Sequence, residues 1–384
     1  MADKNAYTAE QIQVLEGLEP VRKRPGMYIG STDTRGLHEC LREIVDNSVD
    51  ESFAGVADTI WVTLNKDGSA TIRDNGRGIP VEKQKKAGVS ALELTMTKLH
   101  AGGKFEGKAY KISAGLHGVG ASVVNALSSY FRVVVLRDGK AYYQEYKKGN
   151  PLKSVSEASA KQLEEWGIKL EGTGTITNFI PDKEIFGDLK LENGRVKNFL
   201  RDRAYLIAGL TFRFKDLEDG DEATFYFEGG IKSLVAHSNR GKDVLTDAIY
   251  FNKDSGDISC EVALQYSASF NENVKGYVNG IYTTDGGTHV TGFRIALTRA
   301  ITDYYKKMSS GAGSRPAGQN GSTKTETPLT GDDMKEGLTA VVYVKMPSET
   351  LQFESQTKAK LNNPEIQGFM ATTVKEGLDT YFEE

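Results

Sequence analysis

The sequence reads DNGRGIP over residues 74–80. The run just before it alternates apolar and polar residues and predicts a strand, so Asp74 stands at a strand end. Gly76 and Gly78, one residue apart, allow a sharp turn and a close approach of the backbone to a planar ligand. The Asp74 carboxylate can accept a hydrogen bond from an exocyclic amine. A plain turn between a strand and a loop is the other interpretation of this stretch.

The residues before this stretch predict a hairpin preceded by a helix. Apolar and polar residues alternate over 59–65 and 69–73, and the Asp67-Gly68 pair between these runs is a strong hairpin signal. Residues 37–53 predict a helix with one apolar face, which consists of Leu37, Leu41, Ile44, Val45 and Val49.

The opposite stripe of this predicted helix is polar and carries Glu39, Glu43, Asn47 and Asp50. Glu43 and Asn47 are four residues apart, so a carboxylate and an amide oxygen project side by side from one rigid element. Taken alone, such a stripe is more typical of a solvated face than of a catalytic one.

A glycine-rich loop lies further along the chain and reads GLHGVG over residues 115–120. It runs into a helical pattern over 119–127, and glycines before a helix leave free N–H groups that suit phosphate oxygens. The spacing is neither that of a P-loop nor the dinucleotide fingerprint, so the signal is weak alone. Lysines among glycines at 98–111 just before it are typical of a mobile lid over a triphosphate.

The remaining patterns predict an α+β fold. A second hairpin is expected from runs 131–136 and 141–146, a further strand at 173–180, and helical segments at 90–100 and 194–208. Because the strands pair mostly through hairpins, we expect a mixed or antiparallel sheet with helices on one face, rather than a doubly wound parallel sheet.

The Gly229-Gly230 pair marks a boundary between two predicted domains, 1–228 and 229–384. The second is also expected to be α+β, with a long helix at 289–307, a strand at 339–345 and a final amphipathic helix from about residue 364. Residues 309–327 are rich in Ser, Gly and Thr, which predicts a flexible loop.

Composition excludes several classes of protein. The 384 residues carry 48 Lys+Arg and 52 Asp+Glu, a formal charge of -4, which argues against a broadly basic nucleic-acid binder. No run is long and apolar enough for a membrane span or a secretory signal. The 2 cysteines are too few for a disulfide framework, so we expect a reducing, cytoplasmic location and no membrane partner.

In chain order, Glu43-x-x-x-Asn47, Asp74-x-Gly76-x-Gly78, the 115–120 loop and Gly172-Thr173-Gly174 resemble the boxes of the GHKL ATPase superfamily, which includes gyrase, the 90-kilodalton heat-shock chaperone, histidine kinases and MutL. Four further segments sharpen the resemblance: VRKRPGMYIG at 21–30, LHAGGKF at 99–105, DGGTH at 285–289 and SQTK at 355–358. These look like the ATPase subunit of the bacterial type II DNA topoisomerases, meaning gyrase B or its topoisomerase IV counterpart.

The resemblance implies a Bergerat-type ATPase sandwich with an N-terminal dimerisation arm over 1–228 and an α+β transducer domain over 229–384. Glu43 would be the general base that activates water, and Asn47 would complete the coordination of Mg²⁺ on ATP. Asp74 would receive the adenine amino group, with Gly78, Tyr110 and Thr175 also at the nucleotide.

The same resemblance assigns the phosphate contacts. The lid would contribute Lys104, and Lys358 with Gln356 beside it would reach the γ-phosphate from the transducer as a catalytic group. Tyr7 and Ile12 of the arm would cross to the site of the partner protomer. The phosphate loop would consist of Gly115, Leu116, His117, Gly118, Val119, Gly120 and Ala121.

The implied partners are a second copy of the chain, brought together by ATP, DNA inside the resulting clamp, and the DNA-cleaving A subunit in a heterotetramer. A nucleotide-gated clamp of the chaperone or mismatch-repair type is the alternative function, and a catalytically dead homologue is a third. One departure from the family pattern is Glu39, which stands where many members have a histidine. Its like charge one turn before Glu43 is expected to slow turnover.

Overall fold

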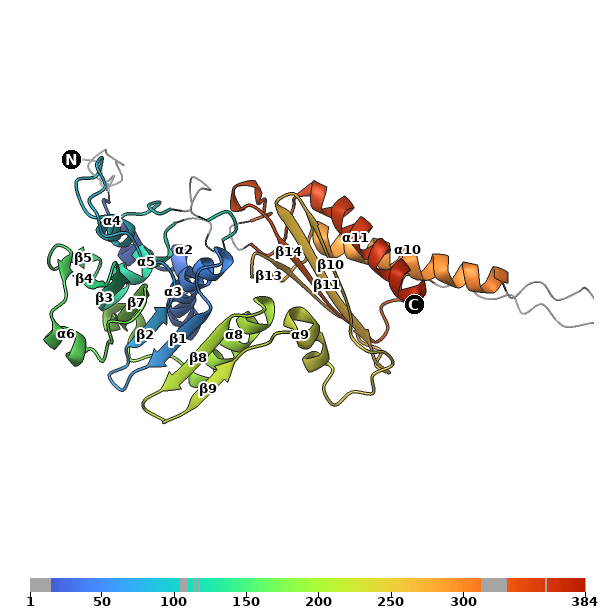
Figure 1. Ribbon diagram of the computed structural model, residues 1–384, viewed down its shortest axis with the longest axis horizontal. Coiled ribbons are helices and arrows are strands. Elements are labelled where there is room, and N and C mark those ends of the chain that lie inside the picture. Colours follow the sequence, from blue (N-terminus) through green and yellow to red (C-terminus); the bar gives the residue numbers. More distant parts are fainter. Residues whose placement is uncertain are drawn as a thin grey trace, which may run out of the picture. The chain divides into compact units, whose positions relative to one another are not determined.

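The computed structural model describes residues 15–103, 110–113, 115, 118–311, 330–355 and 358–383 (Figure 1). The chain forms two compact units. The first comprises the described residues up to Tyr110, together with Gly115–Leu200 and Leu210–Phe225. The second comprises the described part of Lys111–Ala114, Arg201–Gly209 and the described residues from Tyr226 onward.

The first unit is built on a mixed sheet, which has nine strands among the described residues, in the order β5-β4-β3-β7-β2-β1-β8-β9 with β6 paired to β4. Strands β1 and β8 are parallel, and the other neighbours are antiparallel. The strands are β1 (Thr59–Leu64), β2 (Ala70–Asp74), β3 (Ser128–Arg137), β4 (Lys140–Lys147), β5 (Asn150–Pro151), β6 (Ser156–Glu157), β7 (Gly174–Pro181), β8 (Thr211–Asp216) and β9 (Glu222–Phe225).

Helices cover this sheet, and α3 is the longest of those in the first unit that the structure describes. The helices are α1 (Glu19–Lys23), α2 (Gly26–Ile29), α3 (Thr34–Phe53), α4 (Ala91–Thr97), α5 (Gly120–Ala126), α6 (Ala160–Glu165), α7 (Lys183–Phe186) and α8 (Asn193–Leu206). The predicted helices at 37–53, 90–100, 119–127 and 194–208 correspond to α3, α4, α5 and α8, and both predicted hairpins of this unit are present as β1-β2 and β3-β4.

Helix α3 is favoured both by a capping residue at its start and by apolar residues at helical spacing along one face. The Asp33 carboxylate accepts a hydrogen bond from the Arg35 N–H (2.8 Å), which satisfies one of the free donors at the helix start. The apolar face predicted from Leu37 to Val49 is buried, with each of its five side chains at most 4% exposed. It packs on α5 and on the central strands, so the rotation of α3 about its axis is fixed.

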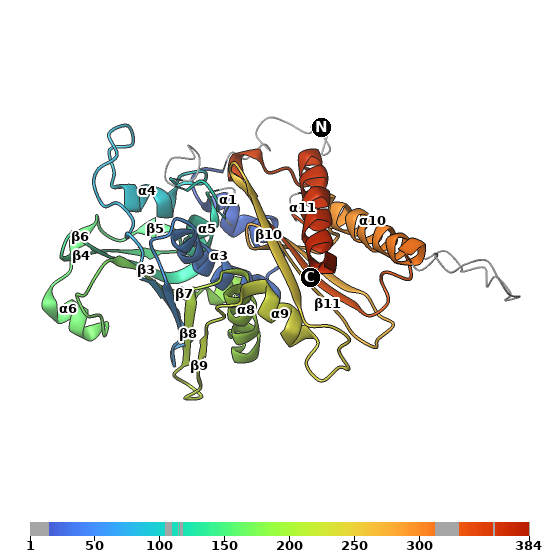
Figure 2. The same cartoon turned by 45° about the vertical axis from the view of Figure 1, so that its right-hand side comes forward.

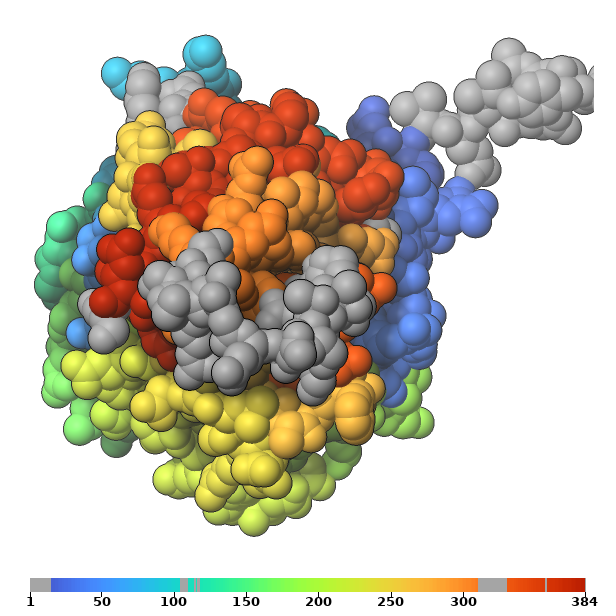
Figure 3. Space-filling view, turned by 90° about the vertical axis from the view of Figure 1, so that its right-hand side faces the viewer, coloured from blue at the N-terminus to red at the C-terminus, as the bar shows by residue number. Residues whose placement is uncertain are grey.

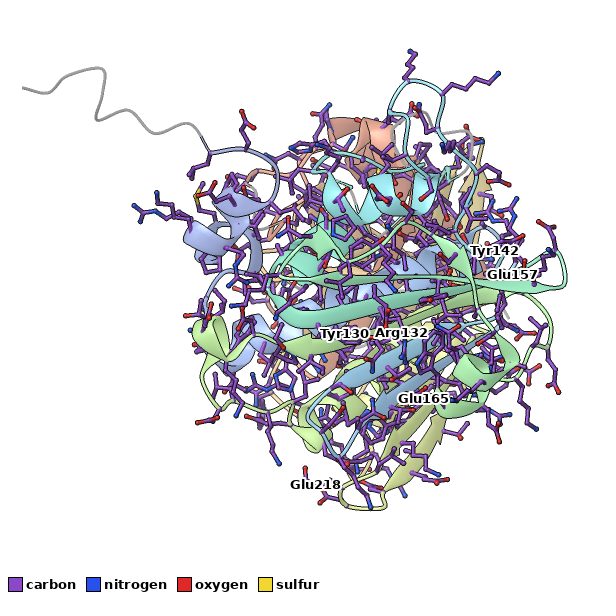
Figure 4. All side chains as sticks on the ribbon, turned by 90° about the vertical axis from the view of Figure 1, so that its left-hand side faces the viewer. Tyr130, Arg132, Tyr142, Glu157, Glu165 and Glu218 are labelled. Atoms are coloured by element: carbon purple, nitrogen blue, oxygen red, sulfur yellow. The ribbon has the colours of Figure 1, made fainter. Side chains whose placement is uncertain are left out.

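The expectation that helices lie on one face is wrong for α6. Side chains alternate along β3, and the face opposite α3 carries Val134 and Leu136, which form a second core with Leu163 of α6. Figure 4 shows the same outer face of β3 with Tyr130 and Arg132 labelled. The Arg132 guanidinium lies 4.1 Å from the centre of the Trp166 ring just after α6. Periodicity could not reveal this cover because β3 is buried on both faces, Phe131 and Val133 included.

The second unit has a five-stranded sheet among its described residues, in the order β10-β11-β14-β12-β13. Figures 1 and 2 show α10 and α11 side by side along one face of this sheet, with α9 on the other face. Figure 3 faces this unit, where the orange α10 and the red α11 form adjoining strips of surface. The elements are α9 (Gly230–Ser238), β10 (Ile249–Ser255), β11 (Ile258–Tyr266), β12 (Asn273–Val278), β13 (Ile281–Thr283), α10 (Thr288–Gly311), β14 (Leu338–Lys345), a short 3₁₀ helix (Ser348–Thr350) and α11 (Pro364–Glu383).

Alternation along β14 explains why both faces are covered. Ala340, Val342 and Val344 belong to one core with α10 and α11. Thr339 points the other way, and its hydroxyl donates to Asn239 Oδ1 at the end of α9 (2.8 Å). Residues 309–311, expected to start a flexible loop, continue α10 instead, and the rest of the predicted loop up to 327 lies outside the described residues.

Two observations bear on the expected environment of the chain. In the part of the chain that the structure describes, no helix is both long and apolar enough to cross a membrane. Cys40 and Cys260 are buried free thiols.

We expect Phe293→Ala to lower the free energy of unfolding of the second unit by about 3–5 kcal/mol, because Phe293 is fully buried under the sheet and the substitution leaves a cavity. Denaturant unfolding followed by circular dichroism measures the loss. Ile295→Ala on the same helix, where Ile295 is 50% exposed, is the matched control and should cost about 0.5 kcal/mol or less. Equal losses in the two variants would contradict the assignment of this core.

Candidate active site

The polar stripe of α3 is not a solvated face. Glu43 and Asn47 are half-buried, and Asp50, expected to share their polar surroundings, is fully buried. Two further polar side chains in the second half of the helix, Ser48 and Glu51, are also buried. A row of buried polar groups on one helix must be matched by partners on other elements, which makes this side of α3 a built site.

The first partner of α3 is the glycine loop that precedes α5. A Cβ added at Gly120 would lie 2.0 Å from Glu43 Oε2 and 3.2 Å from Glu43 Cβ. The backbone at 120 therefore passes directly over the Glu43 carboxylate, and a side chain there would push this carboxylate aside. Gly118 has φ +60°, so the backbone turns sharply just before this contact, and Val119 precedes the helix that starts at Gly120.

The second partner of α3 is Asp74 at the end of β2, which is 3% exposed. Its Oδ1 accepts from the N–H of Gly76 (2.9 Å) and of Thr175 (3.1 Å), and its Oδ2 accepts from the Ser48 hydroxyl (3.0 Å). Burial raises the pKa of the Asp74 carboxyl to about 6, against the lowering effect of these three hydrogen bonds. Asp74 is thus a buried acceptor whose three donors are all uncharged groups.

The start of β7 reaches Asp74 because position 174 has no side chain. A Cβ at Gly174, which has φ +145°, would lie 2.0 Å from the Asp74 carbonyl oxygen. This close approach brings the Thr175 N–H to the Asp74 carboxylate. A Cβ added at Gly78 would lie 3.2 Å from the Gly174 carbonyl oxygen. The predicted Gly78 therefore lies in the same corner of the unit as Gly174 and Asp74.

A cluster of Glu51, Arg77 and Tyr110 closes the site beside Asp74. Glu51 Oε2 accepts from the Arg77 N–H (2.9 Å) and Nε (3.1 Å), and Oε1 accepts from Arg77 Nη2 (2.8 Å) and from the Tyr110 hydroxyl. The Arg77 guanidinium also lies 4.9 Å from the centre of the Tyr110 ring. Burial alone would raise the pKa of Glu51, but the bonds from Arg77 and Tyr110 outweigh it and lower that pKa.

The structure brings most of the predicted nucleotide residues of the first unit into this one region. Glu43 meets the loop at Gly120, which Ala121 follows in α5, while Asp74 meets Thr175 and lies next to the corner that holds Gly78 and Tyr110. Gly115 lies in the loop before Gly118. The predicted residues Tyr7, Ile12, Lys104, Leu116, His117 and Gln356 lie outside the described residues.

Three contributors to the site were not predicted from the sequence: Ser48, Glu51 and Arg77. The spacing could have indicated Glu51, since Glu43, Asn47 and Glu51 follow one another at one-turn intervals. Ser48 gives no such signal, because only the packing of α3 on the sheet turns its hydroxyl toward Asp74. Arg77 lies inside the DNGRGIP turn, but an arginine in a turn is most often a surface residue.

Lys358, the other predicted catalytic residue, belongs to the second unit. It has φ +58°, a left-handed conformation uncommon for a lysine, and its N–H donates to the Ser355 carbonyl (3.1 Å).

The donor set of the first unit suits a nucleotide better than a bare metal ion. Among the described residues, no three His, Cys, Asp or Glu side chains gather so that they could hold a metal. The amide of Asn47 suits a Mg²⁺ ion whose other ligands are phosphates and water, and the Glu43 carboxylate one turn away is left to act on a water molecule. The buried acceptor at Asp74 suits a neutral hydrogen-bond donor such as an aromatic amine.

Comparison with known proteins agrees with this chemistry. Residues 32–157 match the family of histidine kinase-, DNA gyrase B-, and HSP90-like ATPases, and residues 230–384 match the DNA gyrase B family. The DNA gyrase B protein of Archaeoglobus fulgidus is 47% identical over 378 residues, which cover 98% of this chain and 56% of that protein. The chain thus spans just over half the length of the curated relatives that it matches.

Two solved structures match nearly the whole chain. The 43K ATPase domain of Thermus thermophilus gyrase B, solved in complex with an aminocoumarin, has a TM-score of 0.77 and 38% identity, and the match covers 95% of this chain and 90% of that one. The topoisomerase IV ATP-binding domain of Francisella tularensis, solved with a small-molecule inhibitor, has a TM-score of 0.75 and 33% identity, with 96% and 93% coverage. With its first unit in the GHKL ATPase fold, the chain belongs to the gyrase B and topoisomerase IV family of type II topoisomerase ATPase subunits.

Proposed function

We propose that this chain binds and hydrolyses ATP and acts as the nucleotide-driven clamp of a type II DNA topoisomerase. The observation that carries the proposal is the arrangement along α3, where the Glu43 carboxylate lies against the loop at Gly120 and the Ser48 hydroxyl bonds the buried Asp74. One helix thereby links a buried acceptor for a base to a backbone loop for phosphates.

Asp74 binds the adenine amino group in this proposal. Gly76, Thr175 and Ser48 already donate to its carboxylate, and the remaining acceptor capacity of its oxygens is open to an N–H of the base. Burial strengthens such a bond because water competes poorly in a low-dielectric site. Tyr110, held by Glu51 and Arg77, forms a wall for the base, and Gly78 lets the turn that carries Asp74 pack closely on β3 and β7.

Glu43 acts as the general base at the phosphate end. Its carboxylate takes a proton from the water that attacks the γ-phosphorus, while the backbone of the 115–121 loop holds phosphate oxygens through its N–H groups. Asn47 provides the protein ligand for Mg²⁺, which when bound neutralises phosphate charge. Lys104 of the lid and Gln356 complete the phosphate contacts in this proposal.

Lys358, carried by the second unit, senses the γ-phosphate and stabilises its charge during transfer. A contact that exists only with triphosphate gives each nucleotide state a different relation between the domains, 1–228 and 229–384. Tyr7 and Ile12 cross to the partner protomer when ATP brings two copies together. The closed dimer encloses DNA, the A subunit cleaves that DNA, and the assembly works in the cytoplasm.

The alternative is a nucleotide-gated clamp of the chaperone or mismatch-repair type. The matches to gyrase B over residues 230–384 and to topoisomerase IV over nearly the whole chain favour a topoisomerase. Adding the remaining topoisomerase subunits and domains, then measuring ATP hydrolysis with and without DNA, tests the choice. Stimulation by DNA together with a change in DNA topology supports our proposal, and hydrolysis that ignores DNA contradicts it.

Asp74→Asn tests the adenine contact. The amide replaces an acceptor by a donor, so we expect the affinity for ADP to fall by about 10- to 100-fold, as loss of a hydrogen bond to a charged group predicts. Isothermal calorimetry measures the change. Asp138→Asn in the β3-β4 turn, where the Asp138 side chain is 77% exposed, is the matched control and should bind ADP like the parent.

The affinity for adenosine should depend on pH through Asp74. Because the pKa of this carboxyl is raised to about 6, the acceptor is charged above that pH and progressively protonated below it. Affinity should therefore level off about one unit above this pKa and fall as the pH drops through it. Adenosine is the probe because it carries no phosphate that titrates in this range. A flat profile, or the same profile in Asp74→Asn, would rule the assignment out.

Glu43→Gln should separate binding from hydrolysis. We expect kcat for ATP to fall by at least about 100-fold, because a carboxamide cannot take a proton, while ADP still binds. Glu39→Gln, one turn earlier, removes a like charge that is paired with Arg42 (3.2 Å) and should hydrolyse ATP at least as fast as the parent. If Glu43→Gln kept the parental kcat, another group would have to be the base.

A further inference from the structure

The loop that carries Lys358 is paired on two sides within the second unit. On one side, the Glu354 N–H donates to the Lys360 carbonyl (3.0 Å), and the Asn362 N–H donates to the Gln352 carbonyl (2.8 Å). These bonds pair residues 352–354 with residues 360–362 on either side of the loop. Its base is closed by the fully buried Asn363, whose side chain accepts from the Gln352 N–H (2.7 Å) and donates to the Thr350 carbonyl (2.8 Å).

On its other side the loop pairs with the DGGTH turn that starts α10. The Asp285 N–H donates to the Ala359 carbonyl (2.9 Å), the Leu361 N–H to the Gly286 carbonyl (3.1 Å), and the Thr288 N–H to the Leu361 carbonyl (3.0 Å). Leu361 is fully buried in the core that α10 and α11 form with the sheet. The backbone next to Lys358 is therefore bonded to the same elements that make the core.

The contact between turn and loop requires a glycine at 287. A Cβ there would lie 2.4 Å from the Leu361 carbonyl oxygen, 2.5 Å from its nitrogen and 2.9 Å from its Cα, and φ at this position is +134°. Backbone atoms cannot yield as a flexible side chain can. Gly286 differs: its φ is +73°, but a Cβ there meets only the Val290 side chain, at 3.5 Å or more.

The turn has a rigid base of its own. The Thr283 hydroxyl donates to the Gly276 carbonyl (3.0 Å), so the bond of 3.1 Å between Thr283 Oγ1 and His289 Nε2 must be donated by the imidazole. Burial lowers the pKa of His289 to about 3, which keeps the ring neutral at neutral pH, and the bond to Thr283 places its proton on Nε2. The first turn of α10 is thereby fastened to β12 and β13.

We propose that the turn 285–288 is the positioning element for Lys358, and that Gly287 is its determining residue. The turn holds the lysine-bearing arm against the core, so that Lys358 keeps its left-handed backbone and one direction relative to α10. The inference rests on the proposed role of Lys358 at the γ-phosphate. Gly287 acts through Leu361 and the backbone of the loop, so it is a positioning residue and not a catalytic one.

Gly287→Ala in the full 384-residue chain is the test. We expect kcat for ATP to fall by about 100-fold, the scale for a catalytic group displaced by about 1 Å, with unchanged affinity for ADP. Gly256→Ala in the β10-β11 turn is the control: it strains a glycine of the same unit (φ +58°) whose added Cβ meets nothing within 4 Å, so it should keep the parental kcat. Lys358→Ala sets the value for complete loss of the lysine.

The outcomes distinguish this inference from the proposed function. If Lys358→Ala abolishes hydrolysis while a folded Gly287→Ala keeps the parental kcat, the positioning role is refuted and the function stands. Equal losses in Gly256→Ala and Gly287→Ala would also refute it, since backbone strain anywhere in the second unit would then suffice. If Lys358→Ala hydrolyses ATP normally, the role of Lys358 and the inference fall together.

A measurement on the unaltered chain keeps the inference testable should Gly287→Ala not fold. Hydrogen exchange should show the Leu361 and Thr288 amides protected like the amides of β14, with or without ADP. Exchange of these amides at the rate of an unstructured peptide would overturn the proposal.

Discussion

Burial of the apolar face of α3 is the constraint on which the nucleotide site depends. Because side-chain directions repeat every 3.6 residues, seating Leu37 to Val49 on α5 and the sheet leaves the helix one rotation about its axis. That rotation sends Glu43 to the loop at Gly120, Ser48 to Asp74 and Glu51 to Arg77. Three contacts with two separate segments of the chain, the loop before α5 and the 74–80 turn, thus follow from one packing face, and a slip of one residue would lose them all together.

Asp74 and Glu51 are neighbouring buried carboxylates whose pKa values shift in opposite directions. At Asp74 the desolvation penalty exceeds the effect of three hydrogen bonds from uncharged donors, so its pKa rises. At Glu51 the guanidinium of Arg77 and the Tyr110 hydroxyl reverse the balance, and its pKa falls. The difference separates their roles. Glu51 is already satisfied by its own chain and fastens the turn, whereas Asp74, bonded by uncharged donors, gains most from an external donor.

Local patterns were sufficient for the elements and for part of the site. The hairpin signal at Asp67-Gly68, the paired runs 131–136 and 141–146 and the apolar face of α3 each depend on neighbours in sequence, and the structure has all three elements. The packing of α6 on the outer face of β3 was not predicted, because Val134 and Leu136 alternate with residues that are equally buried. The burial of the polar side chains of Asp50, Ser48 and Glu51 was not predicted. Their hydrogen-bonding partners lie on other elements, which a helical pattern alone does not reveal. The Gly174 and Gly287 contacts join segments far apart in sequence, and composition shows only that glycines are numerous.

The fixed loop around Lys358 has an energetic reason in the proposed mechanism. A charge-assisted hydrogen bond to phosphate contributes about 1.5–3 kcal/mol net. Ordering even the four residues 358–361 at the moment of contact would cost roughly 4–8 kcal/mol of backbone entropy. A loose loop would therefore consume more free energy than the lysine gains, and its contact could not shift a domain equilibrium. The backbone pairing on both sides of the loop also holds Lys358 in its left-handed conformation. The entropy of ordering the loop is therefore lost when the second unit folds and not when phosphate binds. The free energy of the phosphate contact then remains to act on α10 and the sheet as one body.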